Sequence, residues 1–286
     1  MAALPETPPN LIEELYALQE EHGYLRERDL RALSERIKVP LYEIGGVASF
    51  YPHFRRTPAP KYQVAVCRDV TCLHHGGERV KTALRGACAG RDDVEFHEVS
   101  CLGRCDAAPA CVVNDVPVPP GEVPGILDGA EELPPDEPTE SPRSWKIDPY
   151  GDPEERYGVL REILDAPDLD AAIEAAIGRL KESGLRGMGG AGFPTGLKWD
   201  LVRKERATPK YLVGNADESE PGTFKARVSL EELPHLVIAG IILGALAVGA
   251  RLGWVYIRHE YTREAKAIQR EIDHAYSIGA LGADVL

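Results

Sequence analysis

The sequence predicts an α/β protein of two domains, and three observations support that fold class. The chain has 286 residues, close to the size at which one hydrophobic core stops growing. Apolar residues make up 43% of the chain and charged residues 28%, which is the composition of a folded globular protein. Strand-like and helical patterns occur on both sides of one acidic, proline-rich segment. We therefore expect domains at residues 1–120 and 156–286, joined by a linker at 121–155.

The beginning of the first domain predicts a small bundle of three helices. Apolar residues repeat at helical spacing after Asn10, which suits an N-cap, and Gly23 suits a helix stop. A second helix is expected over residues 27–37. A third is expected over 41–51, because Pro40 before it has the fixed φ that a helix start needs.

The rest of the first domain predicts a compact α/β unit. Residues 61–66 and 94–99 alternate in the manner of strands, and each run leads into a cysteine. A helix is expected between them over 78–84, and a further short strand over 110–113. The predicted strands therefore bring their cysteine-bearing loops into one small unit.

The predicted linker differs in composition from the segments around it. Residues 121–155 hold seven prolines and eleven acidic residues against two basic ones, which is too proline-rich and too charged to fold alone. After it, helix and strand patterns alternate again, which indicates a second α/β domain. The expected elements are helix 168–183, strand 210–213, helix 233–250, strand 253–257 and helix 262–277.

Charge and hydropathy exclude several classes of partner. A formal net charge of −13 argues against nucleic acid and anionic membranes, because clustered Lys and Arg bind both. The first ten residues lack the basic start and apolar stretch of a secretory signal, so we expect a cytoplasmic protein. The uncharged run 236–250 is shorter than the roughly 18 residues of a membrane helix, which predicts a buried helix and no direct membrane insertion.

Six cysteines without a secretory signal favour metal or redox chemistry over disulfides. Two close pairs stand out, with four residues inside the first pair and three inside the second. Loop-borne thiolate pairs suit a [2Fe-2S] cluster, which needs two per iron. A structural Cys₄ zinc site and four unrelated buried cysteines remain alternatives at this point. The paired residues are Cys67 with Cys72 and Cys101 with Cys105.

The remaining cysteines and the nearby histidines favour ordinary roles. Cys88 and Cys111 lie outside both pairs, and we expect small buried hydrophobes there. His74, His75 and His97 are expected at the surface or near the cysteines without being ligands.

Residues 11–115 resemble the thioredoxin-like [2Fe-2S] subunit of the NADH-oxidising module of respiratory complex I. The resemblance rests on GGVASFYPHF at 45–54, CRDVTC at 67–72 and SCLGRCDAAPACVVND at 100–115. It implies a thioredoxin-like fold in which Cys67, Cys72, Cys101 and Cys105 hold the cluster, and it disfavours zinc. Only 28 residues separate the second and third of these cysteines, which implies a shortened loop.

Two loops of the second half carry ligand-binding chemistry. Residues 187–192 read G-x-G-x-x-G, but they follow a predicted helix and not a strand, which disfavours a conventional Rossmann domain. The following Phe193 and Lys198 add a ring and a cation to exposed backbone N–H groups, which suits a phosphate and a flat ring. Residues 214–222 follow a predicted strand, where α/β sheets bind ligands. A tight structural loop and a solvated acidic turn are the alternatives.

Residues 160–286 resemble the FMN- and NADH-binding subunit of the same complex I module. The shared stretches are GLRGMGGAGFPTGLKW at 184–199, YLVGNADESEPGTFKAR at 211–227 and LPHL at 233–236. The resemblance implies an FMN site lined by Gly187, Gly189, Lys198, Asn215, Asp217 and Glu218. It also implies a nicotinamide nucleotide facing Gly190, Phe193 and Glu220. Met188 stands where the family usually has Arg.

The order of the two halves resembles the fused diaphorase subunits of NAD-linked hydrogenases and formate dehydrogenases. It implies hydride transfer from NADH to FMN and onward release of single electrons to iron–sulfur clusters, with no side chain needed as a strong general base. The implied partners are other iron–sulfur and flavoprotein subunits of a multisubunit NADH-linked complex. The family continues with a Gly-Glu-Glu stretch and a [4Fe-4S] domain that do not occur before Leu286. We therefore expect a C-terminally incomplete FMN/NADH-binding domain.

Two other functions stay open. The chain could be an accessory [2Fe-2S] electron-transfer subunit without flavin activity of its own. Residues 29–51 also resemble a helix-turn-helix, which would suit a redox-sensing DNA binder, but the expected recognition helix has no Lys or Arg.

Overall fold

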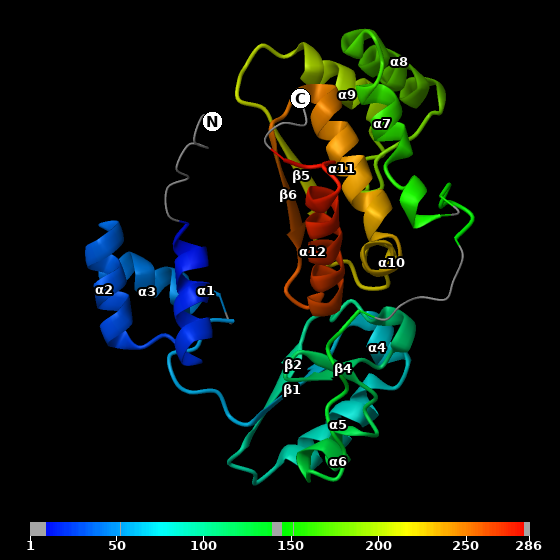
Figure 1. The fold of residues 1–286 in the computed structure, drawn as a ribbon. Coiled ribbons are helices and arrows are strands. Elements are labelled where there is room, and N and C mark those ends of the chain that lie inside the picture. Colours follow the sequence, from blue (N-terminus) through cyan, green and yellow to red (C-terminus); the bar gives the residue numbers. More distant parts are fainter. Residues whose placement is uncertain (1–9, 52, 139–144, 151, 283–286) are drawn as a thin grey trace.

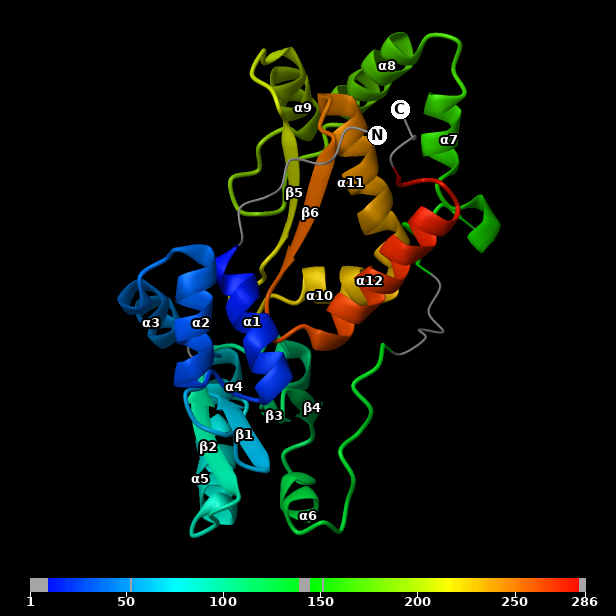
Figure 2. The ribbon, with the colours of Figure 1, turned by 60° about the vertical axis from the view of Figure 1, so that its left-hand side comes forward.

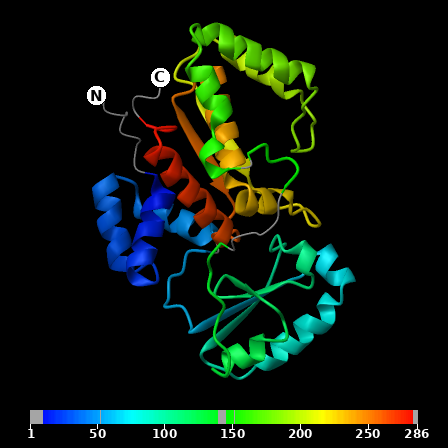
Figure 3. The ribbon, with the colours of Figure 1, turned by 45° about the vertical axis from the view of Figure 1, so that its right-hand side comes forward.

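The computed structural model describes residues 10–51, 53–138, 145–150 and 152–282 (Figure 1). Three bodies follow one another along the chain: a helical bundle, a unit built on a four-stranded sheet, and a larger unit built on two parallel strands. Figures 2 and 3 show these bodies packed around a common junction. The mixed α/β class predicted from the sequence is confirmed.

The helical bundle consists of α1 (Leu11–His22), α2 (Glu27–Ile37) and α3 (Leu41–Phe50). Both predicted ends of α1 are confirmed. The Asn10 side chain accepts from the N–H of Ile12 at 3.1 Å, and Gly23 ends the helix with a φ of +76°. Leu15, Leu30 and Ile44, one from each helix, are fully buried and form the core of the bundle.

The second body, called the sheet unit below, has the strand order β2-β1-β3-β4. β1 and β2 are parallel and the other pairs are antiparallel. Its elements are β1 (Tyr62–Cys67), α4 (Val70–His74), α5 (Gly77–Cys88), β2 (Val94–Val99), a 3₁₀ turn at Cys105–Ala107, β3 (Cys111–Val113), β4 (Val116–Val118) and α6 (Val123–Leu127). β4 was not predicted. It pairs with β3 across a two-residue turn in which Asn114 and Asp115 have φ values of +50° and +65°.

The segment expected as a linker is held against both of its neighbours where the structure describes it. Its first part forms α6, whose Val123, Ile126 and Leu127 are buried in the core of the sheet unit. Farther along, the Trp145 indole N–H donates to Glu232 at 2.7 Å. Proline and charge therefore prevented a core of its own, but they did not prevent this segment from packing on the cores beside it.

The third body, called the flavin unit below after the resemblance of its sequence, packs helices on the parallel strands β5 (Tyr211–Ala216) and β6 (Leu252–Ile257). Its helices are α7 (Gly158–Leu164), α8 (Leu169–Glu182), α9 (Thr195–Lys204), α10 (Lys225–Glu232), α11 (Pro234–Val248) and α12 (Thr262–Ser277), after a 3₁₀ turn at Pro153–Glu155. The predicted apolar helix is α11, and it lies in the core against the two strands. Figure 2 shows α11 and α12 on one side of β5 and β6.

The other face of β5 and β6 carries large exposed side chains. Tyr211, Val213, Trp254 and Tyr256 point outward, and the Tyr211 and Trp254 rings lie 5.4 Å apart. Within the described residues, no single helix has the length and apolar character of a membrane span. The pair α10 and α11, bent by 97°, meets that criterion only when the two helices are taken together.

Candidate functional site

The four cysteines of the two predicted pairs gather at one end of the sheet unit. Cys67 ends β1 and Cys72 lies in α4, whereas Cys101 and Cys105 lie in the segment after β2. The Sγ atoms of Cys101 and Cys105 are 3.5 Å apart. Three of the thiols are buried and that of Cys105 is half-buried. Leu102 packs with Cys67 and Cys72 in a small apolar cluster, which shields this end of the unit from solvent.

Backbone N–H groups point at all four sulfur atoms. Cys67 accepts from Asp69 at 3.5 Å, Cys72 from Ala110 at 3.4 Å and Cys101 from Gly103 at 3.4 Å. Gly103 has a φ of +69°, a conformation that favours glycine and turns its N–H inward. The fourth sulfur, that of Cys105, accepts from the N–H of Gly222 at 3.2 Å, and Gly222 belongs to the flavin unit.

These contacts fit a cluster of thiolates. Burial raises the pKa of the Cys67 thiol and that of the Cys101 thiol to about 11. A metal that binds them must therefore displace protons, which is the usual coupling between metal binding and thiol ionisation. Among the described residues, no three His, Cys, Asp or Glu side chains gather as ligands of a single ion. Two sulfur pairs with inward N–H donors fit the two-iron cluster that the resemblance implies.

The two remaining cysteines lie elsewhere, as predicted. Cys88 and Cys111 belong to the hydrophobic core of the sheet unit, and the Cys111 thiol donates to the Val118 carbonyl at 3.2 Å. Burial raises the pKa of Cys111 to about 12, so this thiol stays protonated and behaves as a small apolar side chain.

The predicted flavin residues lie on two loops of the flavin unit. Because β5 and β6 are parallel, the segments that follow them meet at the same edge of the sheet. One segment is the acidic loop, residues 217–222, and the other begins at Arg258. Three of the four predicted residues here have exposed side chains, namely Asn215, Asp217 and Glu220. The fourth, Glu218, is buried.

Glu218 turns inward and binds the start of α10. Its carboxylate accepts from the backbone N–H groups of Ala226 at 2.7 Å and Arg227 at 3.2 Å, and from the Tyr261 hydroxyl at 3.1 Å. A carboxylate at the N-terminus of a helix is stabilised by the uncovered N–H groups and the helix dipole. This gives Glu218 a structural function that the sequence did not indicate. Its predicted contact with FMN stays a prediction.

The glycine-rich loop lies between α8 and α9, after a helix as expected. Gly187, Gly189 and Gly190 are exposed, as are the Phe193 ring and the Lys198 side chain in the first turn of α9. Gly190 has a φ of +108°, and a Cβ added to it would meet no atom within 4 Å. The Gly187 N–H donates to the Phe193 carbonyl at 2.9 Å, whereas Gly189 and Gly190 lie exposed ahead of the helix that carries Lys198, which fits the phosphate end of FMN.

The cysteine loop of the sheet unit, residues 101–106, docks directly onto the flavin unit. Arg104 forms a bidentate contact with Glu264 of α12, at 2.8 Å for the closer pair of atoms. Glu264 is fully buried, and burial raises its pKa although the Arg104 guanidinium opposes that change. Arg227 of α10 donates to Asp106 at 2.5 Å. The second half of the cysteine loop is thus held by two charge pairs.

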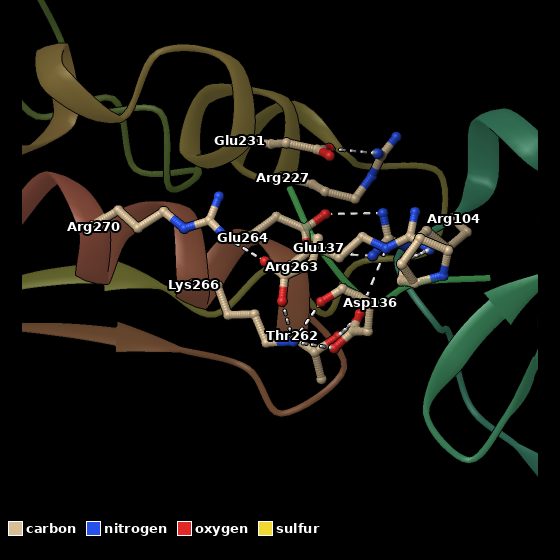
Figure 4. Close-up of polar contacts among 11 residues, drawn as sticks. Arg104, Asp136, Glu137, Arg227, Glu231, Thr262, Arg263, Glu264, Lys266 and Arg270 are labelled. Carbon is tan, nitrogen blue, oxygen red and sulfur yellow. Dashed lines mark hydrogen bonds and ion pairs between the residues drawn. The ribbon is translucent and has the colours of Figure 1, made fainter. Parts of the chain in front are cut away.

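Figure 4 shows Arg104, Arg227 and Glu264 beside a second group of ion pairs on α12. There Asp136 accepts from the Thr262 hydroxyl at 2.9 Å and pairs with Lys266 at 3.0 Å, while Glu137 pairs with Arg270. These acidic residues come from the expected linker. The linker therefore fastens α12 next to the point where the cysteine loop docks.

Sequence reasoning missed the residues that join the two units. Arg258, Tyr261 and Glu264 follow β6, so their place at the carboxyl edge of a parallel sheet was a usable signal. Arg104 gave no such signal, because its partner lies 160 residues away along the chain.

Comparison with known proteins agrees with this arrangement. Residues 1–123 match the thioredoxin-like [2Fe-2S] ferredoxin family, and residues 180–283 match the Nuo51 FMN-binding domain. The chain thus joins a thioredoxin-like [2Fe-2S] domain to a Nuo51 FMN-binding domain. This confirms the resemblance stated from the motifs.

Individual relatives extend the comparison. The NAD-reducing hydrogenase HoxS subunit alpha of Cupriavidus necator is 31% identical over 303 aligned residues, which cover 95% of this chain and 49% of that subunit. One NADH-quinone oxidoreductase subunit of Rhizobium meliloti is 46% identical over 130 residues, 46% of this chain and 30% of the relative. A solved NAD⁺-reducing [NiFe]-hydrogenase in the H₂-reduced state superposes with a TM-score of 0.76 at 30% identity, covering 95% of this chain and 49% of the other. The chain therefore spans half or less of the length of these relatives.

Proposed function

We propose that this chain is the NADH dehydrogenase (diaphorase) component of a larger assembly, passing electrons from NADH through FMN to iron–sulfur clusters. In this proposal Cys67, Cys72, Cys101 and Cys105 hold a [2Fe-2S] cluster. The observation that carries the proposal is the contact of Gly222 with Cys105, in which the acidic loop of the flavin unit touches a cluster ligand at 3.2 Å. One chain thereby brings the predicted iron–sulfur ligands and the predicted flavin loop into direct contact.

Different residues of the flavin unit would bind the two ends of FMN, one group the phosphate and the other the ring and ribityl chain. Gly189 would offer its backbone N–H to the phosphate, from a loop that Gly187 closes by donating its own N–H to the Phe193 carbonyl at 2.9 Å. Lys198 would add a point charge that Met188 cannot supply. Asn215 and Asp217 lie at the end of β5 and have side chains that can hydrogen-bond the ring edge or ribityl hydroxyls. The Asn215 amide oxygen already accepts from the N–H of Asp217 at 3.0 Å, which fixes the turn that carries both.

The nicotinamide nucleotide would face Gly190, Phe193 and Glu220. The Phe193 ring is 46% exposed and offers a flat apolar surface. Gly190, in the same loop, has no side chain to obstruct a ligand. FMN, when bound, would supply the redox chemistry by which a hydride from NADH becomes two electrons released singly, leaving NAD⁺. The protein residues place and orient the two cofactors, and the nearby carboxylates bind and do not transfer protons.

The same proposal implies partner subunits and a cellular location for the chain. The hydrogenase and complex I relatives are subunits of multisubunit enzymes. We infer that other iron–sulfur and flavoprotein subunits bind this chain and receive its electrons. A cytoplasmic location, peripheral to a membrane through partner subunits, belongs to the proposal as well.

A reduction experiment tests the proposal on the whole chain. The protein is reconstituted anaerobically with iron and sulfide, supplied with excess FMN, and mixed with NADH while the visible absorption of the cluster is followed. The excess matters because the glycine-rich loop is exposed and is expected to hold FMN weakly. NADH should reduce the cluster only when FMN is present. A cluster that dithionite reduces but NADH with saturating FMN does not would overturn the proposed function.

The inward carboxylate of Glu218 favours a second candidate, an accessory [2Fe-2S] electron-transfer subunit without flavin activity. A carboxylate that caps α10 is engaged by four donors, the N–H groups of Ala226 and Arg227, the Tyr261 hydroxyl and the Lys225 ammonium, and is not directed at a ring. A fluorescence titration with FMN separates the two candidates, since only the first predicts saturable quenching of FMN fluorescence by the reconstituted chain.

A further inference from the structure

Arg258 lies between the cysteine loop and the acidic loop and contacts both. It follows β6 and is buried, and its guanidinium donates to three acceptors. One Nη donates to the backbone carbonyl of Cys101, and the other donates to the carbonyl of Glu218 at 2.5 Å. Nε donates to the Glu260 carboxylate at 2.9 Å. One side chain therefore links a predicted cluster ligand to the loop predicted to hold FMN.

The acidic loop reaches a second ligand from the same direction. Four residues after Glu218, the Gly222 N–H donates to Cys105 Sγ at 3.2 Å, the shortest of the four N–H to sulfur contacts. The sulfurs of Cys67 and Cys72 accept from N–H groups of the sheet unit itself. The pair formed by Cys101 and Cys105 is thus held from the flavin unit, while the other pair is held from within the sheet unit.

The cysteine loop packs closely against Tyr261 of the flavin unit. A Cβ added to Gly103 would lie 2.3 Å from the Tyr261 ring, which is fully buried. The Tyr261 hydroxyl donates to Glu218, the same residue whose carbonyl accepts from Arg258. Arg258 therefore fixes the acidic loop and the cysteine loop together.

We propose that Arg258 is a positioning residue through which the flavin unit sets the reduction potential of the [2Fe-2S] cluster. This inference rests on the proposed function, because it requires the cluster. The potential of such a cluster follows the local charge, the hydrogen bonds to its sulfurs and its exposure to solvent. Reduction adds one electron, and therefore one negative charge, and breaks no bond. The buried Arg258 guanidinium and the Gly222 N–H both stabilise that added charge, so both favour the reduced form.

The experiment is a redox titration of the whole reconstituted chain with mediators, followed by the electron paramagnetic resonance signal of the reduced cluster. Arg258→Gln removes the charge and one carbonyl contact. Arg258→Lys keeps the charge but cannot span two carbonyls. Glu260→Gln removes the opposite charge and leaves the guanidinium in place. Arg270→Gln is the matched control, because it removes a positive charge of α12 that contacts Glu137 and neither loop.

The expected order of midpoint potentials separates positioning from simple loosening of the fold. Arg258→Gln should shift the reduced-to-oxidised ratio at a fixed potential about tenfold toward oxidised, which is about 59 mV for one electron. Arg258→Lys should lie between this variant and the unaltered chain, and Glu260→Gln should shift the other way. If Arg258→Gln fails to take up iron, the Arg258→Lys and Glu260→Gln variants still show whether the midpoint potential shifts in the expected directions.

Three results would overturn the inference. A potential of Arg258→Gln equal to that of Arg270→Gln would show that the guanidinium does not act on the cluster. Shifts of the Arg258 and Glu260 variants in the same direction would indicate loosening alone. An unaltered chain that takes up no iron would overturn the proposed function itself, and this inference with it.

Discussion

The contact between Gly103 and Tyr261 allows a quantitative test of how the two units dock. Gly103 has a φ of +69°, and a Cβ there would meet Cε1 of Tyr261 at 2.3 Å and its Oη at 2.5 Å. Alanine at this position incurs about 1–2 kcal/mol for the left-handed conformation. It also overpacks a buried ring that cannot move away, which costs about 1–3 kcal/mol. Gly103→Ala should therefore destabilise the docked structure by about 2–5 kcal/mol.

Gly90→Ala is the matched control for this substitution. Gly90 lies in the same unit with a φ of +76°, but a Cβ there would meet nothing within 4 Å. It should lose only the conformational part, about 1–2 kcal/mol. Replacing Tyr261 by Leu should relieve the clash, so Gly103→Ala should cost about as much as Gly90→Ala in that background.

The assay is urea unfolding of the reconstituted chain, followed by the visible absorption of the cluster and by far-ultraviolet circular dichroism. The free energy of unfolding is compared between the two alanine variants, with and without Tyr261→Leu. An equal loss for Gly103→Ala and Gly90→Ala would refute the reasoning, because the clash with the buried ring would then contribute nothing.

Three further predictions concern the ligands, the flavin and the junction. Serine at any of the four paired cysteines should abolish the visible absorption of the reconstituted chain, whereas serine at either core cysteine should leave the spectrum unchanged; bleaching by a core variant would contradict the assignment. Lys198→Ala should weaken FMN binding in a fluorescence titration far more than Met188→Ala, and equal affinities would exclude Lys198 from the phosphate site. The pKa of His259 lies above its ordinary value because the Asp115 carboxylate lies 3.8 Å from its Nε2, and the pKa of Asp115 lies below its ordinary value for the same reason. Their pair therefore contributes most between about pH 4 and 6.5 and is lost as pH rises through the raised pKa of His259. Asp115→Asn should lower the pKa of His259 in an NMR titration, and an unchanged value would remove Asp115 as the cause.

Local patterns predicted the regular elements well where apolar periodicity and end signals agreed. The last helix, α12, was predicted with its observed bounds, Thr262–Ser277, because apolar residues repeat over its whole length. The bounds of α2 were also predicted correctly. In contrast, β4 has only three residues, and its hairpin turn of Asn114 and Asp115 was overlooked. Helix α10 was missed because its stabilising cap comes from Glu218, several residues before its first turn.

The candidate site was predictable in its ligands and unpredictable in its assembly. Cysteine spacing indicated the two pairs, because ligand pairs lie close together in sequence. Docking of the cysteine loop depends on Arg104, Arg227 and Arg258, whose partners lie 160, 121 and 157 residues away. Periodicity carries no information on which distant acceptor an arginine side chain meets. The same limit applies to the Gly222 N–H, which finds Cys105 only in the folded chain.

The most direct test of the account is the metal content of the whole chain. The protein is produced in iron-replete cells, purified without oxygen, and analysed for iron, acid-labile sulfide and zinc per chain. We expect two irons and two sulfides per chain, carried by Cys67, Cys72, Cys101 and Cys105. One zinc per chain, with no iron taken up on reconstitution with iron and sulfide, would contradict it.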